Sequence, residues 1–351
     1  MINALMIGPD PESKGGIATV INNILNNREF LDDVSFTNWP SYSDGSLMRR
    51  ACFSAMKEVD FRFLEHVYDV YHIHTASGTS FWRKRRYIEA LGEDSQRAVL
   101  HIHSGGFVDF WDRCSSSQKS KVRTAFSKVG RVIALSANLA RQYEECGICD
   151  GEKIEILPNA VDIPEHNLTD YAANTVLFMG RLDENKSPDV LIRAAAIVIA
   201  SHPDARFVFA GDGDSSDYES LANELCIGDS CDFLGWVSGE TKEELLLSSS
   251  IFCLPSRREA LPMSILEAMS YGLAVVATNQ GGIPSVVEDG VNGMLMEVGD
   301  YVGLAGILNV LMNNFEAKKA LGESGRAHVR DSYGMSAYMR KLIKIYREVS
   351  L

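Results

Sequence analysis

The sequence predicts an α/β protein with two doubly wound domains, each a parallel sheet with helices on both faces. Short β-branched or aliphatic runs alternate with helical-length segments along the whole chain, which is typical of crossover-connected sheets. The alternation stops once, in the polar stretch 163–174, and then restarts. The length of 351 residues also exceeds what one hydrophobic core usually supports.

The first domain is expected to span residues 1–165. Its periodic apolar runs predict six strands with helices in the gaps, and glycine or proline follows several of these runs. The expected strands are 4–8, 34–38, 69–74, 98–103, 131–135 and 154–157.

The second domain is expected to span residues 170–332 and to repeat the same plan. A final amphipathic helix, 336–351, follows it and is expected to pack back on the first domain and complete it. The expected strands are 175–179, 206–210, 231–234, 251–254, 274–278 and 293–297.

Composition narrows the classes of protein. With 46% apolar and 23% charged residues the chain has a globular composition, and its net charge of −13 argues against nucleic-acid binding. The N-terminus lacks a basic region and a sustained apolar run, so a cytoplasmic location is expected. The seven cysteines are scattered, and the Cys146–Cys149 pair has no second pair to complete a zinc site, so reduced thiols are expected.

One segment is strongly basic, although the chain as a whole is acidic. Residues 81–86 read Phe-Trp-Arg-Lys-Arg-Arg, from Phe81 to Arg86. Such a cluster can bind an acidic acceptor or anionic lipid headgroups, and lipid binding would place the protein peripherally at the inner face of the cell membrane. The alternative is a solvated start of a helix.

The richest segment is 252–282, in which a strand is followed by a polar loop and a helix beginning around Pro262. Proline at the first helical position leaves the next amides available to an anion, which the helix dipole also favours. Glu259 and Glu267 flank this helix start and would repel a phosphate, unless they face the hydroxyls of ribose and hexose instead. The alternative is that Glu259 is a surface residue and Glu267 pairs locally.

A second segment, 176–195, places two cations after a strand and before a helix opening at Ser187-Pro188. Arg181 and Lys186 could stabilise a diphosphate leaving group in place of a divalent metal.

Together, GRLDENK, AGDGD, FLGWV, the Glu259–Glu267 pair and GGIPSVVEDGVNG resemble the retaining family-4 glycosyltransferases of GT-B fold. The resemblance is strong over 153–300 and collinear elsewhere. It implies two Rossmann-like domains facing across a cleft, with a nucleotide sugar as donor. Arg181 and Lys186 would hold the diphosphate, Glu267 the ribose and Glu259 the transferred sugar. The backbone of Ala260, Leu261 and Pro262 would line sugar and phosphate, and Gly213 and Val237 would border the base.

In the first domain the resemblance implies that Gly16, in the loop after the first strand, approaches donor phosphate and acceptor. It also implies that His103 faces the reacting sugar, although a lone strand histidine is more often a core residue. His72, His74 and His101 lie on similar strand ends. The chain departs from the common family pattern at Ala160, where glycine is usual, and at Ser285, where many members have glutamate.

The resemblance implies transfer of a hexose or N-acetylhexosamine, with retention, from a UDP- or GDP-sugar to a saccharide or polyprenyl-linked saccharide in surface polysaccharide synthesis. No cofactor and no metal are expected. Two alternatives remain: a nucleotide-sugar epimerase or hydrolase, and a non-catalytic nucleotide-sugar-binding subunit. Asp212-Gly213-Asp214 has the Asp-x-Asp form that binds manganese in another transferase fold, which keeps a metal site open as a further alternative.

Overall fold

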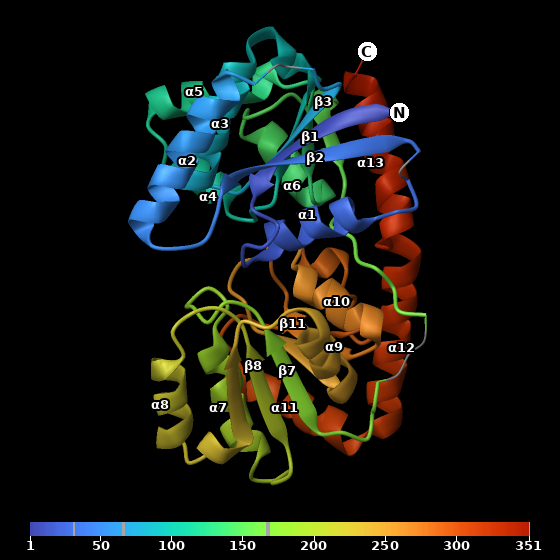
Figure 1. The fold of residues 1–351 in the computed structure, drawn as a ribbon. Helices are drawn as coiled ribbons and strands as arrows, with labels where there is room; N and C mark the ends of the chain where they lie inside the picture. Colours follow the sequence, from blue (N-terminus) through green and yellow to red (C-terminus); the bar gives the residue numbers. More distant parts are fainter. Residues whose placement is uncertain (31, 65–66, 166–168, 351) are drawn as a thin grey trace. The chain divides into compact units, whose positions relative to one another are not determined.

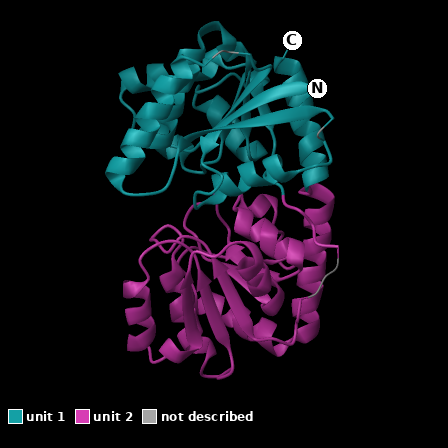
Figure 2. Ribbon diagram, in the orientation of Figure 1, with its two compact units in different colours: residues 1–160, 335–351 teal, residues 161–334 magenta. Residues whose placement is uncertain are grey.

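The computed structural model describes residues 1–30, 32–64, 67–165 and 169–350, which form two compact units (Figures 1 and 2). Unit 1 comprises residues 1–160 and 335–351, and unit 2 comprises residues 161–334. Residues 161–165, which the sequence analysis placed in the first domain, therefore belong to unit 2. The described residues of the polar stretch 163–174 contain neither helix nor strand, and residues 166–168 lie outside the described part of the chain.

Unit 1 is a six-stranded parallel sheet in the order β2-β1-β3-β4-β5-β6, with helices between the strands. Its strands are β1 (Ile2–Pro9), β2 (Val34–Tyr42), β3 (Val70–Thr75), β4 (Ala98–Ile102), β5 (Arg131–Ala134) and β6 (Ile154–Ile156). Its helices are α1 (Gly16–Asn26), α2 (Leu47–Arg62), α3 (Thr79–Leu91), α4 (Phe107–Asp112), α5 (Ser116–Lys128), α6 (Ala137–Glu145) and α13 (Met335–Val349).

Unit 2 is a second six-stranded parallel sheet, in the order β12-β11-β10-β7-β8-β9. Its strands are β7 (Thr175–Met179), β8 (Arg206–Ala210), β9 (Cys231–Gly235), β10 (Ile251–Leu254), β11 (Ala274–Thr278) and β12 (Met294–Met296). Its helices are α7 (Pro188–Val198), α8 (Ser216–Glu224), α9 (Gly239–Ser248), α10 (Met263–Tyr271), α11 (Tyr301–Asn313) and α12 (Phe315–Ser332).

All twelve strands expected from the sequence are present, and the α/β class is confirmed. The largest difference in bounds is at β2, which was expected to end at Asn38 and continues to Tyr42. Its extension contains Pro40, and β2 is the edge strand of its sheet. An edge strand tolerates proline because one side of the strand needs no ladder hydrogen bonds.

Most residues of the interior strands are buried, because helices cover both faces of a parallel sheet. Every residue of β3, β4, β10 and β11 is buried. The last helix, α13, belongs to unit 1 and buries one face that includes Tyr338, Leu342 and Tyr346. At its end, Arg347 pairs with Asp33 at 2.8 Å. The sequence analysis expected this helix at 336–351, of which Leu351 lies outside the described residues.

Each sheet has a point at which the strand order reverses. In unit 1 the chain winds outward in both directions from the neighbouring strands β1 and β3, and in unit 2 from β7 and β10. Loops at the carboxyl ends of such strand pairs diverge and leave room for a ligand. The loops after these four strands are therefore the places to look for a site.

None of the helices in the described ranges combines the length and apolarity that a bilayer crossing requires.

Candidate functional site

The loops after β7 and β10 lie against each other in unit 2. The amide of Arg257 donates to the carbonyl of Asn185 at 2.7 Å, and the Arg257 guanidinium donates to the carbonyl of Glu184 at 3.1 Å. In return, the Asn185 side chain donates to the carbonyl of Arg258 at 3.2 Å. The switch point of the sheet therefore carries one connected polar loop pair, 180–187 and 255–262. Arg257 could not be identified from the sequence, because one arginine beside another in a polar loop carries no distinctive signal.

Lys186 and Glu259, which were predicted separately from two segments, form an ion pair across these loops. Their side chains are 21% and 9% exposed, so the pair is partly shielded from water. The amide of Lys186 is held by the Asp183 carboxylate at 3.0 Å. The predicted diphosphate-binding cation and the predicted sugar-binding carboxylate are therefore in direct contact.

Two glycines fix the backbone on which Glu259 sits. A Cβ on Gly281 would lie 1.7 Å from the carbonyl oxygen of Glu259, and one on Gly282 would lie 1.5 Å from that of Ala260. Gly281 also has a φ of 59°, in the left-handed region that favours glycine. The hydroxyl of Ser285 donates back to the carbonyl of Gly282 at 2.6 Å. Gly281 and Gly282 therefore allow the loop after β11 to approach the backbone of Glu259 and Ala260.

Helix α10 starts one residue later than expected. Pro262 is its N-cap residue, with extended backbone at φ −70° and ψ 128°, rather than its first helical residue. The expected arrangement of proline at the first helical position occurs instead in α7, at Pro188. Among the described residues, no side chain caps α10, so its first amides remain available to an anion. Ala260, Leu261 and Pro262 are buried beneath this helix start.

Glu267 lies in α10 and forms an ion pair of 2.9 Å with Lys242 of α9. The Glu267 side chain is 15% exposed and the Lys242 side chain 31%. Lys242 was not identified from the sequence, because it lies in an ordinary charged helix start, Glu-Thr-Lys-Glu-Glu, and meets Glu267 only through the packing of α9 on α10.

Arg181 is the most exposed of the predicted donor residues, with a side chain 67% exposed and 3.8 Å from Asp183. The loop that carries it lies against the loop after β8, since the amide of Leu182 donates to the carbonyl of Asp212 at 2.7 Å. Gly213, with a φ of 130°, pairs with Leu182 in the same contact. Val237 lies in the turn between β9 and α9, and is half-buried.

The Asp-x-Asp segment lies in the loop before α8. Asp214 is exposed and accepts hydrogen bonds from the amide and the hydroxyl of Ser216, at 3.0 Å and 2.7 Å, which lower the pKa of its carboxyl group. Within the described residues, no group of three or more potential metal ligands includes Asp212 or Asp214. All seven cysteines are unpaired thiols, and Cys146 and Cys149 belong to no such group either.

In unit 1 the loop after β1 leads into α1, of which Gly16 is the first residue. The residue before it, Gly15, has a φ of 127°, and within the described part of the chain an added Cβ there would meet nothing within 4 Å. His103 follows β4, is half-buried, and lies 3.0 Å from His74 between ring nitrogens. Gly16 and His103 therefore lie in segments that follow strands β1 and β4 of unit 1, and the other predicted residues lie in unit 2.

The basic cluster 81–86 differs from the expectation. It lies in α3, where Phe81 is 0% exposed and Lys84 is 1% exposed, so neither can reach a lipid headgroup. Lys84 instead donates to the hydroxyl of Ser41. The helical period turns these two residues to the core, and Arg86, which is exposed, pairs with Glu58 at 2.8 Å.

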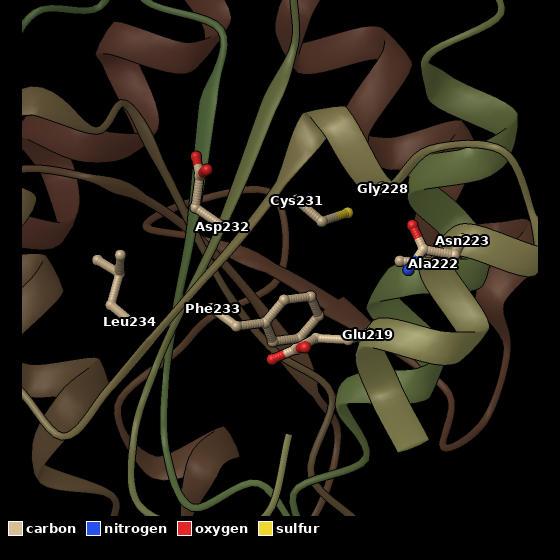
Figure 3. Close-up of a pocket in the computed structure, with 8 residues that line it drawn as sticks. All are labelled: Glu219, Ala222, Asn223, Gly228, Cys231, Asp232, Phe233 and Leu234. Atoms are coloured by element: carbon tan, nitrogen blue, oxygen red, sulfur yellow. The ribbon is translucent and has the colours of Figure 1, made fainter. Parts of the chain in front are cut away.

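A pocket of about 370 Å³ lies elsewhere in unit 2, between α8 and the edge strand β9 (Figure 3). None of the predicted donor-binding residues lines it. Its position away from β7 and β10 argues against it as the donor site. Its lining residues are Glu219, Ala222, Asn223, Gly228, Cys231, Asp232, Phe233 and Leu234.

The chain is similar to several proteins along most of its length. It is 30% identical to a phosphatidyl-myo-inositol mannosyltransferase of Mycolicibacterium smegmatis, over 63% of the chain and 58% of that protein. It is 23% identical to an uncharacterized 41.2 kDa protein in the cps region of Klebsiella pneumoniae, over 95% and 97%. A crystal structure of Anabaena HepE in complex with UDP-glucose matches with a TM-score of 0.75 and 18% identity, covering 98% of this chain and 99% of that chain.

The chain spans about half the length of most of the curated relatives that it matches, between 41% and 64%. Two family models match it in succession. The model described as Glycosyltransferase Family 4 matches residues 22–165, and the model described as Glycosyl transferases group 1 matches residues 162–328. With these matches and two six-stranded parallel sheets of GT-B type, the chain belongs to the family-4 glycosyltransferases.

Proposed function

We propose that the protein is a retaining glycosyltransferase that moves a hexose or N-acetylhexosamine from a UDP- or GDP-sugar to a saccharide or lipid-linked saccharide. The observation that carries the proposal is the polar cluster at the β7/β10 switch point, where Lys186 and Glu259 pair beside the uncapped start of α10. HepE shares the fold, and its crystal structure contains UDP-glucose. That complex supports a nucleotide sugar as the donor.

The charges of this cluster suit a metal-free diphosphate site. The start of α10 offers amides and a positive dipole end to one phosphate, and Lys186 and Arg181 offer two cations. A diphosphate would draw the ammonium of Lys186 away from Glu259, and Glu259 would then accept hydrogen bonds from hydroxyls of the transferred sugar. The same cations would stabilise the charge that develops on the leaving diphosphate.

Retention is proposed to proceed by attack of the acceptor on the face from which the diphosphate leaves, with the diphosphate taking the acceptor proton. The bond from the anomeric carbon to the diphosphate oxygen breaks as the bond to the acceptor oxygen forms. His103 would orient the sugar, and Gly16 would allow the backbone to approach substrate. A saccharide acceptor in surface polysaccharide synthesis completes the proposed reaction.

A membrane contact through residues 81–86 has less support than the sequence suggested. Two of the six residues are buried, and Arg85 and Arg86 pair with Glu89 and Glu58. Charges that are already paired lose these partners when they bind a lipid headgroup, which reduces the gain.

A thermal-shift panel tests the donor assignment. UDP, GDP, ADP and their glucose, mannose and N-acetylglucosamine conjugates would be compared, with and without EDTA. We expect one nucleotide family to raise the midpoint of unfolding, since a ligand at a hundred times its Kd stabilises the folded state by about 2.7 kcal/mol. We also expect the rise to survive EDTA. Stabilisation by none of the nucleotides would contradict the proposal, and stabilisation that EDTA removes would contradict metal independence.

A further inference from the structure

Four histidines of unit 1 form a two-by-two array on β3 and at the end of β4. His72 and His74 pack ring against ring with centroids 4.0 Å apart, and His101 and His103 do the same at 4.0 Å. Between the strands, His72 Nε2 lies 3.1 Å from His101 Nδ1, and His74 Nδ1 lies 3.0 Å from His103 Nε2. Residues two apart on a strand point to the same face, so two His-x-His sequences on neighbouring strands produce this array.

The array has one buried end and one accessible end. His72, His74 and His101 are 0% exposed, and the hydroxyl of Tyr346 in α13 lies 2.6 Å from His72 Nδ1. His103 is only half-buried, and it follows the strand at the carboxyl edge of the sheet. A substrate at this edge could meet His103 but not the three imidazoles behind it.

Burial favours the neutral form of all four imidazoles. Burial lowers the pKa of His72 and of His103 to about 3, and it lowers the pKa of His74 and of His101 well below the usual histidine range. A neutral imidazole has one N–H and one acceptor nitrogen. In the contact between His74 and His103, one ring must therefore donate and the other must accept, so the protonation of the two nitrogens is linked.

We propose that His74 is a positioning residue, whose Nδ1 holds His103 in one ring orientation and one tautomer. Since Nε2 of His103 is engaged by His74, Nδ1 is the ring nitrogen that remains for a substrate hydroxyl. The inference rests on the proposed function, because a fixed orientation of His103 matters only if a sugar approaches it. Orientation by a second group is a common way to fix which nitrogen of a functional histidine carries the proton.

A metal ion is the other occupant that such a cluster suggests, since His72, His74 and His101 each offer a nitrogen within 4.8 Å of the others. Two features argue against it. Both ring nitrogens of His72 already take part in hydrogen bonds, to Tyr346 and His101. The group of potential ligands also contains only neutral imidazoles, so a divalent charge would be buried without a compensating carboxylate.

The test compares two substitutions of the same kind on the same strand. His74→Phe removes the partner of His103, whereas His72→Phe removes the partner of His101 and leaves the pair of His74 and His103 in place. With the nucleotide sugar that stabilises the wild type most, we expect His74→Phe to lower kcat about tenfold to hundredfold, by analogy with metal-bound imidazoles that lose an orienting partner. KM for that donor should stay within about twofold, because the donor-binding candidates lie in unit 2. His74→Asn, whose amide can replace Nδ1, should restore most of kcat, and His72→Phe should keep it.

Two further measurements separate the outcomes. In ¹⁵N-histidine-labelled protein without ligand, His74→Phe should shift the ring nitrogen signals of His103 and His72→Phe should leave them. The double variant His103→Ala/His74→Phe should have the same kcat as His103→Ala alone. Unchanged kcat in His74→Phe, with nucleotide stabilisation intact, would overturn the inference but leave the proposed function standing. Stoichiometric Co²⁺ binding to the wild type that both His→Phe variants abolish would overturn it in favour of a metal site.

Discussion

Replacing Lys186 with alanine is expected to lower kcat/KM for the nucleotide sugar about 10²–10³-fold, the usual cost of losing one group that stabilises transition-state charge. Lys186 is the partly buried cation of the β7/β10 cluster and contacts Glu259 directly. Its loss removes a positive charge from the proposed diphosphate site and leaves a carboxylate that is 9% exposed without its partner. Steady-state kinetics of nucleoside diphosphate release would measure the effect.

The unpaired carboxylate of Glu259 could itself lower activity by destabilising the fold. The test therefore needs a control for stability. In the double variant Lys186→Ala/Glu259→Gln no unpaired carboxylate remains, and we expect the free energy of unfolding to recover while activity stays lost. Arg206→Ala removes an equal charge from the amino end of β8, where Arg206 pairs with Asp232 at 2.8 Å, and it should leave kcat/KM unchanged. Recovery of activity in the double variant would mean that Lys186 only supports the fold.

Replacing Glu267 with alanine is expected to weaken nucleotide binding by about a hundredfold or more. Two ribose hydroxyls that donate to one carboxylate would each contribute about 1.5–3 kcal/mol, and about 1.4 kcal/mol corresponds to a factor of ten. Calorimetric titration with the nucleoside diphosphate found in the thermal-shift panel would measure the loss.

A comparison of nucleotides makes this prediction specific to the ribose. The wild type should bind the 2′,3′-dideoxy analogue far more weakly than the parent nucleotide, and Glu267→Ala should bind the two equally. Lys242→Met removes the partner of Glu267 without removing the acceptor, so it should keep the discrimination. Equal discrimination in the wild type and in Glu267→Ala would show that Glu267 does not contact the ribose.

Most of the fold could be predicted because the buried strands and the helices between them each leave a local pattern in the sequence. Apolar runs such as those of β7 and β10 are visible in the sequence, and Gly180 and Pro255 follow them directly. The predicted ends of strands and helices were less accurate where tertiary contacts determine them. Pro40 remains within a strand because β2 lies at an edge of its sheet, and Pro262 occupies the N-cap position of α10 rather than its first helical position.

The polar contacts depended on information that the sequence does not display. Glu259 and Lys186 come from segments more than seventy residues apart, and their separate motifs indicated a common role but not their direct pairing. Lys242 has no motif at all, since it reaches Glu267 only because α9 packs on α10. In the basic cluster 81–86 the charge run predicts exposure of every charged residue, whereas the helical period buries Lys84.

The central claim is that the nucleotide diphosphate of the donor binds at the β7/β10 switch point of unit 2. A crystal structure of the chain with the best-stabilising nucleotide sugar, grown in EDTA, tests it most directly. We expect the diphosphate at the start of α10 in contact with Lys186, the ribose on Glu267 and the sugar beside Glu259. A nucleotide in the pocket between α8 and β9, or one bound only when a divalent metal is restored, would contradict it.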